Sequence, residues 1–363
     1  MNSDSNSNSN SNVKKISNKE ILGGVISLLI TLFFLYLAFR NVDLQKAFNL
    51  LFSRVSMGYF FLFILIFLFT NVVRAVRWKY ILLNVKKDVS LVNLFGAMMI
   101  GYGVNAIIPR LGEFYRAFFL GKWEGVSRGS MFGTVIVERL VDLLVLFVSV
   151  VISVAVYSGN IYSKVPWLKD TLLWGSLIIG ILIILLVLLS ISGEKSYSGL
   201  VKFVGRFSQS ASKQLNDIFE SLVQGISSFS GTKNILLVIF LSLIVMVLYG
   251  LNSLVGFYML DMQSINIVNY KMAWILMTIS AFGIIIPTPG GIGSYHAIVI
   301  FVLTVLFNFG EEISATYALL THFISYVGFI SLAFLSIWYI NRRQVKLGKT
   351  KYNFWSVLRS RDD

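Results

Sequence analysis

The sequence predicts an all-α polytopic membrane protein, and three observations predict this class. Of the 363 residues, 56% are hydrophobic, and the mean hydropathy is +0.77. Only 13% are charged, whereas soluble domains have about 25%. Apolar stretches long enough to cross a bilayer as helices recur along the whole chain. The chain has too few polar residues to cover the surface of a folded domain of this size. Lipid must therefore cover much of that surface.

The chain begins with a tail, residues 1–19, that is rich in Ser and Asn. It has almost nothing to bury, so we expect it to be disordered. One transmembrane domain should then occupy residues 20–341, followed by a basic tail, residues 342–363. Stretches of about 20 apolar residues predict about six spanning helices, namely 20–39, 57–78, 131–157, 170–191, 234–259 and 314–340.

Two further stretches, 91–121 and 272–308, are interrupted by polar residues, Gly and Pro. The first stops at Pro109, and the second is divided by Pro287 and Pro289 and the glycines after them. Neither half of the second stretch is long enough to cross a membrane alone. We therefore predict two re-entrant hairpins, although a simple hydropathy count gives seven to eight helices.

The distribution of Lys and Arg supports this topology, because loops rich in these residues stay on the cytoplasmic side. The N-terminal tail has three and the segment from Arg342 onward has seven. Both termini should therefore be cytoplasmic in a cell (cytoplasmic) membrane. The basic linkers 79–90 and 192–233 agree with this orientation. The loop 40–56 does not, because it carries three basic residues and must lie outside.

The order of elements also suggests an inverted repeat. A helix, a hairpin and a helix over residues 57–157 are followed by the same series over 234–340, with the opposite orientation. Ile107-Ile108-Pro109-Arg110-Leu111-Gly112 resembles Ile285-Ile286-Pro287-Thr288-Pro289-Gly290. Inverted repeats with interrupted segments at matching positions indicate a transporter-like binding site. Chance similarity between two apolar Pro/Gly turns is the alternative.

Residues 196–229 are too polar to span. Their apolar side chains recur at helical spacing, which predicts a basic amphipathic helix. It either lies on the cytoplasmic membrane surface or docks on the underside of the protein.

Three polar motifs inside the predicted membrane domain could bind a ligand. In the first, Arg110, Glu113 and Arg116 follow Pro109. Non-helical backbone at membrane depth survives only inside protein or beside a water-filled cavity. The planar guanidinium fork suits phosphate, so a phospholipid head group is the expected ligand. An ordinary basic cytoplasmic loop is the alternative.

The second motif is Glu138-Arg139-Leu140-Val141-Asp142, inside an otherwise apolar helix. Glu138 and Asp142 share a helix face, and Arg139 can pair with Asp142. Each charge costs roughly 2.5–3.5 kcal/mol to place at mid-membrane, so all three need partners or water. They either contact the ligand or form a structural ion-pair lock with Arg110 or Arg116.

The third motif runs from Pro287 to His296 and includes Gly290, Gly291 and Gly293. The helix that follows should present its N-terminal N–H groups to an anion. His296 and His322, the only histidines, could relay protons or make hydrogen-bonded helix contacts. A fourth motif, from Arg74 through Arg77 to Lys79, is explained by snorkelling at a helix end, with some head-group contact allowed for.

Other chemistries are excluded or disfavoured. The chain has no cysteine, which excludes disulfides and thiolate metal sites. We expect no metal and no cofactor. Gly291-x-Gly293 is not a dinucleotide site, because no strand precedes it. The net charge of +14 fits cytoplasmic loops facing anionic lipid, and no soluble segment could form a nucleic-acid reader.

Taken together, these motifs resemble the transmembrane domain of the lysylphosphatidylglycerol synthase/flippase family over residues 20–340. The resemblance rests on their order and spacing: Arg74-x-x-Arg77-Trp78, Asn105-x-x-x-Pro109-Arg110-x-Gly112-Glu113-x-x-Arg116, Glu138-Arg139-x-x-Asp142 and Pro287-x-Pro289-Gly290-Gly291-x-Gly293. The family usually has an acidic residue at the position of His296. We expect no aminoacyl-transferase domain like that of the synthase, so the resemblance implies lipid handling without lysyl transfer.

We therefore expect a flippase-like protein, not an enzyme, whose partner is a phospholipid or lipid-linked substrate. A homo-oligomer or a biosynthetic partner protein is possible. The alternatives are a membrane enzyme and a non-catalytic partner in lipid or polysaccharide assembly. The expected head-group residues are Arg77, Arg110, Glu113, Arg116, Glu138, Arg139, Asp142, Pro287, Gly290, Gly291, Gly293 and His296.

Overall fold

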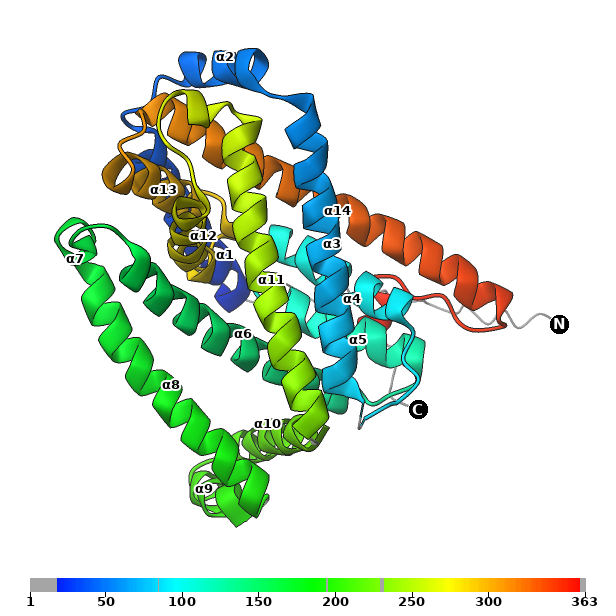
Figure 1. Ribbon diagram of the computed structural model, residues 1–363. Helices are drawn as coiled ribbons and strands as arrows, with labels where there is room; N and C mark the ends of the chain where they lie inside the picture. Colours follow the sequence, from blue (N-terminus) through cyan, green and yellow to red (C-terminus); the bar gives the residue numbers. More distant parts are fainter. Residues whose placement is uncertain (1–17, 84, 194, 229–231, 360–363) are drawn as a thin grey trace.

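The computed structural model describes residues 18–83, 85–193, 195–228 and 232–359. All regular structure in this part of the chain is helical, which confirms the predicted all-α class (Figure 1). The disorder predicted for residues 1–19 falls almost entirely outside the described residues.

Each of the six predicted spans is a helix of 22 to 36 residues. Their bounds differ from the predicted ones by a few residues, because apolarity does not locate the last polar turns of a helix. These helices are α1 (Asn18–Phe39), α3 (Met57–Leu82), α6 (Arg128–Val156), α8 (Trp167–Ser192), α11 (Thr232–Met259) and α14 (Glu311–Lys346).

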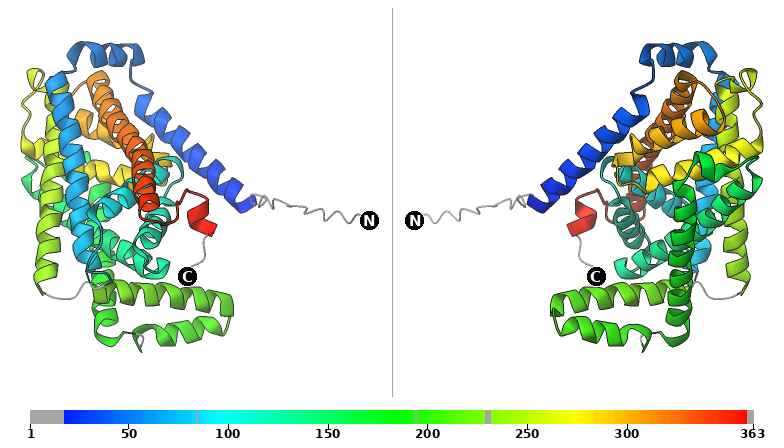
Figure 2. Two further views of the ribbon diagram at one scale, coloured as in Figure 1. Left: turned by 90° about the vertical axis from the view of Figure 1, so that its right-hand side faces the viewer. Right: turned by 90° about the vertical axis from the view of Figure 1, so that its left-hand side faces the viewer.

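Short elements lie at the two ends of the molecule. Helix α2 (Leu44–Arg54) lies at one end, and α9 (Lys195–Gly205) and α10 (Gln209–Ser228) lie at the other (Figure 1). The short α7 (Ile161–Lys164) joins α6 to α8. Figure 2 shows that α1 rises toward α2 while α3 descends from it. Asp43 caps α2 by accepting a hydrogen bond from the N–H of Lys46, and this bond lowers the pKa of the Asp43 carboxyl.

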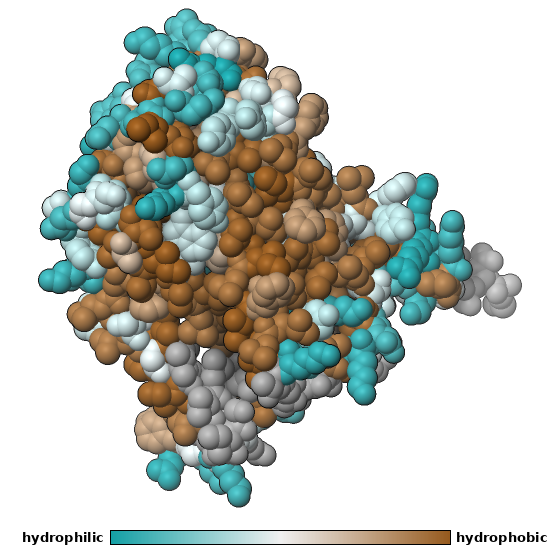
Figure 3. Space-filling model, in the orientation of Figure 1, coloured by the Kyte–Doolittle hydropathy of each residue, from teal (hydrophilic) through white to brown (hydrophobic). Residues whose placement is uncertain are grey.

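Between these ends the surface is hydrophobic, as lipid contact requires (Figure 3). Leu29, Leu65 and Leu243 are examples of large apolar side chains that are more than half exposed. Among the described residues, five helical stretches are long and apolar enough to cross a membrane, and one of them, Pro289–Leu306, belongs to the second predicted hairpin. The number of complete crossings therefore stays a prediction of the charge distribution.

Both predicted hairpins are pairs of short helices joined at a break. The first consists of α4 (Leu91–Ile107) and α5 (Gly112–Glu124). The second consists of α12 (Tyr270–Ile285), the 3-10 turn η2 (Pro289–Gly291), and α13 (Ser294–Phe301), which continues into the π-helical η3 (Val302–Leu306).

The tips of the two hairpins contact each other. The hydroxyl of Tyr326 donates to the carbonyl of Ala106 at 3.1 Å, and the same tyrosine ring lies beside Gly290 of the second tip. The guanidinium of Arg110 donates to the carbonyl of Ile285 at 3.3 Å. Only part of the broken backbone is buried in protein: Gly112, Thr288 and Gly291 are buried, whereas Ile107, Ile108 and Arg110 are exposed.

The packing of helices supports the predicted inverted repeat. The units α3–α6 and α11–α14 are joined by the pair α3 and α11, which run side by side. One further pair of contacts between the units is exchanged, since α4 packs on α14 and α12 packs on α6. A two-fold relation between the units requires this exchange. Chance similarity of two turns would not produce it.

Residues 196–229 differ from the prediction of one amphipathic helix. The described part, residues 196–228, forms most of two helices, α9 and α10, which pack on each other, with a break at residues 206–208. The second of these packs on α6 and also touches α3. The segment thus corresponds to the docked alternative. The spacing of apolar residues predicts an apolar helix face, but it does not show whether that face packs on the membrane or on the protein.

A labelling experiment tests the hairpin topology, and the absence of native cysteine makes it clean. The exposed positions Lys87 and Gly129 precede and follow the first hairpin. We expect a membrane-impermeant thiol reagent to reach Lys87→Cys and Gly129→Cys from the same side, and Ser264→Cys only from the opposite side. Labelling of Lys87→Cys and Gly129→Cys from opposite sides would show that one half of the hairpin is a complete span.

Candidate lipid head-group site

Helices α3, α5 and α6 bring five charged side chains together, and we name them the arginine–carboxylate cluster. Its members are Arg74, Arg77, Arg116, Glu138 and Asp142. The two acidic residues stand one helical turn apart on α6 and point the same way, as their spacing predicts. The two arginines of α3 stand three residues apart, which likewise places them on one face.

Glu138 is the centre of the cluster and is completely buried. Its Oε1 accepts a hydrogen bond from Nη2 of Arg77 at 3.0 Å, and its Oε2 accepts one from Nη1 of Arg116 at 2.5 Å. The lock with Arg116 that the sequence suggested as one alternative therefore exists. Charge-assisted hydrogen bonds of this kind are about twice as strong as neutral ones, so this carboxylate joins α3, α5 and α6.

Asp142 binds both arginines of α3. Its Oδ1 lies 2.6 Å from Nη2 of Arg77, and its Oδ2 lies 3.3 Å from Nη2 of Arg74. Helix α11 completes this side of the cluster, because Tyr249 accepts from Arg74 at 2.8 Å and Ser242 accepts from Arg77 at 3.2 Å. The cluster thus lies between both repeat units.

The buried charges of the cluster do not balance. Three arginines face two carboxylates, and the side chains of these arginines are at most 8% exposed. Nη2 of Arg116 is buried and has no hydrogen-bond partner among the described residues. Leaving such a donor unsatisfied costs about 1–3 kcal/mol, and more where the group is charged. An anion bound beside Arg116 would remove this cost.

A second, more exposed layer connects the cluster to the first hairpin. Arg139 pairs with Asp142 at 3.5 Å, as its spacing predicts, and approaches Glu113 at 3.8 Å. Asn105 donates to Glu113 at 3.1 Å and accepts from the N–H of Gly112 at 2.7 Å. Arg139, Asp142 and Glu113 are each between 23% and 34% exposed, so a ligand could reach them.

The interpretation of Arg74 and Arg77 as snorkelling residues is wrong. Helix α3 continues to Leu82, so Arg77 lies more than a turn from its end. Its side chain is fully buried, whereas a snorkelling guanidinium stays in water. Sequence reasoning thus omitted Arg74 from the site. The three-residue spacing to Arg77 places both arginines on one helix face and could have identified Arg74 as a site residue. No feature of the sequence marked Tyr249 or Ser242 as members of the site.

Arg110, which we predicted to hold a phosphate together with Arg116, makes no hydrogen bond or ion pair with the cluster in the described part of the chain. Arg110 is exposed at the break between α4 and α5, with a φ of 65°. It donates to the second hairpin rather than to a carboxylate. Arg116 is turned into the cluster because it lies on the buried face of α5.

The predicted glycine-rich motif forms the tip of the second hairpin. Its residues contact α1 as well as the first tip: Ser27 donates to the carbonyl of Pro287 at 3.0 Å, and Gly293 lies against the backbone of Thr31. Gly290, Gly291 and Gly293 have φ values of 58°, 80° and 84°, which favour glycine. No hydrogen bond or ion pair of the described residues joins Pro287, these glycines or His296 to the cluster.

His296 has a structural task at this tip. Its Nδ1 accepts from the N–H of Gly293 at 3.3 Å, at the position where a capping-box carboxylate accepts from the N-cap backbone. An imidazole can therefore replace the acidic residue that is usual here. Its ring packs edge-on against His322, whose Nε2 lies 2.9 Å from the carbonyl of Gly290. This geometry corresponds to the predicted hydrogen-bonded helix contact.

A pair of substitutions tests this capping task. His296→Asn keeps an acceptor near the N–H of Gly293, and His296→Leu removes it. Loss of a helix cap costs about 0.5–2 kcal/mol, so we expect His296→Leu to lower the free energy of unfolding by that amount relative to His296→Asn. Reversible denaturation of both variants in detergent measures the difference, and equal stability would contradict the assignment.

Among the described residues, no group of three or more His, Asp or Glu side chains is arranged to hold a metal ion. The site is instead a cluster in which three buried guanidinium groups face two carboxylates. Such groups can bind and orient phosphate bidentately, and they cannot exchange protons near neutral pH.

Comparison with known proteins finds relatives that are membrane proteins. The UPF0104 membrane protein MJ1595 of Methanocaldococcus jannaschii is 23% identical over 335 residues, which cover 89% of this chain and 96% of the relative. A UPF0104 membrane protein of Methanothermobacter thermautotrophicus is 26% identical over 254 residues, which cover 66% of this chain and 71% of the relative. No solved structure matches the chain significantly.

The family described as "Lysylphosphatidylglycerol synthase TM region" matches residues 24–333. The match includes α3 to α6 and both hairpins. The chain is therefore a multi-pass integral membrane protein that belongs to the lysylphosphatidylglycerol synthase transmembrane-region family.

Proposed function

We propose that the protein is a lipid flippase that binds the phosphate of a phospholipid or lipid-linked head group at the arginine–carboxylate cluster. The observation that carries the proposal is the excess of buried positive charge, three arginines against two carboxylates, together with the unpartnered Nη2 of Arg116. A phosphate supplies the missing negative charge and the missing acceptor in one group.

The surroundings of the cluster support movement of this ligand. The cluster lies where α3, α5, α6 and α11 converge, so both repeat units line it. In transporters with inverted repeats, the substrate binds between the repeats, and rocking of one unit against the other opens each side in turn. Arg139 and Glu113 at the more exposed edge would meet the head group first.

Membrane placement and partners belong to the same proposal. We place the protein in the cytoplasmic membrane with both termini on the cytoplasmic side, because the basic residues concentrate there. A membrane lipid is the expected partner, and no enzymatic step is assigned. The alternatives, a membrane enzyme or a non-catalytic partner in lipid or polysaccharide assembly, predict no lipid movement by the purified protein.

Arg116→Lys tests the phosphate-binding task. Lysine can keep the ion pair with Glu138 but loses the second terminal nitrogen. We expect lipid movement in vesicles to fall roughly tenfold, since one charge-assisted hydrogen bond is worth about 1.5–3 kcal/mol. Vesicles that hold the purified variant and several fluorescent lipid classes provide the measurement.

The matched control is Arg342→Lys, because Arg342 is exposed and stacks on Trp338 at the end of α14. It should move lipid at the rate of the unchanged protein. Equal rates for Arg116→Lys and Arg342→Lys would remove Arg116 from the site. Equal rates for vesicles with and without the unchanged protein, in every lipid class, would remove the flippase proposal.

A further inference from the structure

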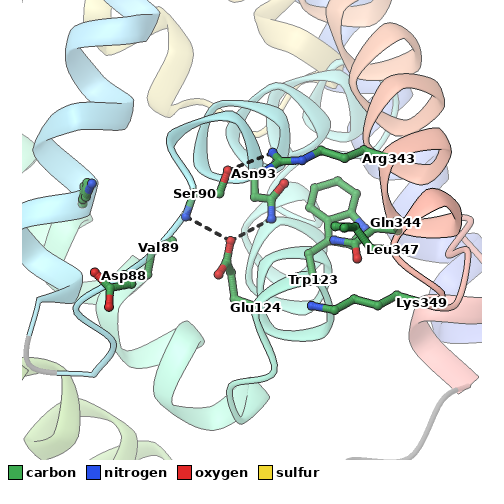
Figure 4. A pocket seen from close by; sticks show the side chains of 11 residues that line it. Asp88, Val89, Ser90, Asn93, Trp123, Glu124, Arg343, Gln344, Leu347 and Lys349 are labelled. Carbon is green, nitrogen blue, oxygen red and sulfur yellow. Dashed lines mark hydrogen bonds between the residues drawn. The ribbon is translucent and has the colours of Figure 1, made fainter.

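A second polar site lies apart from the arginine–carboxylate cluster. It is a cavity of about 390 Å³ where α3 ends, α4 begins, and α5 and α14 end. Figure 4 shows the side chains around it. Its volume is at the small end of the range for ligand pockets, roughly 300–1,000 Å³, and suits a group the size of a sugar phosphate. Its lining residues are Lys79, Asp88, Val89, Ser90, Asn93, Trp123, Glu124, Arg343, Gln344, Leu347 and Lys349.

Three of these side chains have a buried polar atom without a partner in the described part of the chain. They are Oδ1 of Asn93, Nε1 of Trp123 and Oε1 of Gln344. Each side chain is at least nine-tenths buried, with exposed fractions of 6%, 2% and 5%. Buried polar groups almost always have partners, so three orphans around one cavity indicate a missing polar occupant.

The orphaned atoms define the hydrogen-bonding character of this occupant. Nδ2 of Asn93 donates to Glu124 at 2.7 Å, which fixes the amide and leaves Oδ1 as a true acceptor. Two acceptors, Asn93 and Gln344, therefore require donors from the occupant, and Trp123 requires an acceptor. Hydroxyl groups satisfy both requirements.

The charges around the cavity indicate the charge of the occupant. Lys79, Arg343 and Lys349 line it, against the carboxylates Asp88 and Glu124. Glu124 is already paired with Lys86 at 3.1 Å, which leaves three cations facing one free carboxylate. An occupant that donates through ammonium groups would be repelled by these cations. An anion that carries hydroxyl groups is attracted and also meets the orphaned acceptors.

We propose that this cavity binds a hydroxylated phosphate, with the phosphate at Lys79, Arg343 and Lys349 and the hydroxyls at Asn93 and Gln344. The same chemistry occurs in a soluble polyol phosphate and in a polyol lipid head group. The site is independent of lipid movement, because its binding can be measured without transport. An experiment that disproves binding at this cavity therefore leaves the flippase proposal untouched, and the reverse also holds.

The first experiment uses soluble probes and the purified full chain in detergent. Inositol 1-phosphate should bind at least roughly tenfold tighter than inorganic phosphate by calorimetry, because hydrogen bonds to two orphaned groups add more than about 1.4 kcal/mol. Arg343→Ala and Lys349→Ala, both at exposed positions that tolerate change, should weaken both probes. Gln344→Leu should reduce the preference for inositol 1-phosphate over inorganic phosphate.

The matched control is Lys346→Ala, an exposed lysine three residues before Lys349 that does not line the cavity. It should bind both probes as the unchanged protein does. An equal loss of affinity in Lys346→Ala and Lys349→Ala would mean that only the general positive charge attracts the probe, and would overturn the site.

The second experiment separates the two sources of the ligand. Native mass spectrometry counts lipids that remain bound after the protein is released from nanodiscs with equal phosphatidylinositol and phosphatidylcholine. Enrichment of phosphatidylinositol that Arg343→Ala and Lys349→Ala remove supports a lipid head group. Binding of inositol 1-phosphate without this enrichment supports a soluble ligand. Absence of both overturns the proposal.

Discussion

Glu138→Ala should lower the free energy of unfolding by roughly 3–5 kcal/mol, the cost of breaking a buried ion pair by removing one partner. Glu138 is fully buried, and its two carboxylate oxygens accept one hydrogen bond each from Arg77 and Arg116. Without it, Asp142 remains as the only carboxylate of the cluster for three buried arginines. Reversible unfolding in detergent, followed by circular dichroism, measures the effect.

Glu138→Gln separates charge from shape. The amide has one acceptor atom where the carboxylate has two, so its NH₂ group must face an N–H of Arg77 or Arg116. We therefore expect Glu138→Gln to be destabilising as well, and Arg116→Met in the same chain to restore part of the loss. Stability of Glu138→Gln equal to that of the unchanged protein, with lipid movement lost, would assign Glu138 to the ligand rather than to the lock.

Gly112→Ala should have the second-largest effect, because it forces the two helices of the first hairpin apart. A Cβ at Gly112 would overlap the backbone carbonyl of Gly101 and lie 2.8 Å from the side chain of Asn105. Backbone cannot move aside as a flexible side chain can. Overpacking of this kind costs about 1–3 kcal/mol, and more where relief is impossible, so folded protein should be strongly reduced.

The control for this substitution is Gly180→Ala on α8, where a Cβ would meet no atom within 4 Å. Alanine is favoured over glycine in a helix by about 0.8–1.0 kcal/mol, so this variant should be at least as stable as the unchanged protein. Size-exclusion profiles and thermal unfolding of both variants in detergent give the comparison. Normal folding of Gly112→Ala would show that α4 and α5 do not pack as described.

Hydrophobic length and breakers predicted the helices of this fold well. Six long apolar stretches became six long helices, and the breaks at Pro109 and at Pro287–Gly293 became the two hairpin tips. These features are local, because the length of an apolar run and the backbone freedom of Gly and Pro act within a few residues. Helix ends were less accurate, and the four extra residues of α3 changed the interpretation of Arg77.

The candidate site could be predicted only in part. Arg116, Glu138 and Asp142 could be chosen because charges inside an apolar helix need partners. The sequence could not say which arginine would serve. Arg110 and Arg116 are six residues apart on the same hairpin, yet only Arg116 enters the cluster. The turn between α4 and α5 decides which of them faces α6.

The sequence by itself thus determined that this chain is a helical, multi-pass membrane protein with two broken segments and buried charges, because composition and period are properties of the chain alone. Only the tertiary structure decided which charges meet, since partners such as Arg77 and Glu138 lie 61 residues apart. It also decided that Tyr249 and Ser242 complete the cluster, and that Asn93, Trp123 and Gln344 surround one cavity. Such contacts depend on how helices pack, and no local pattern of residues encodes that packing.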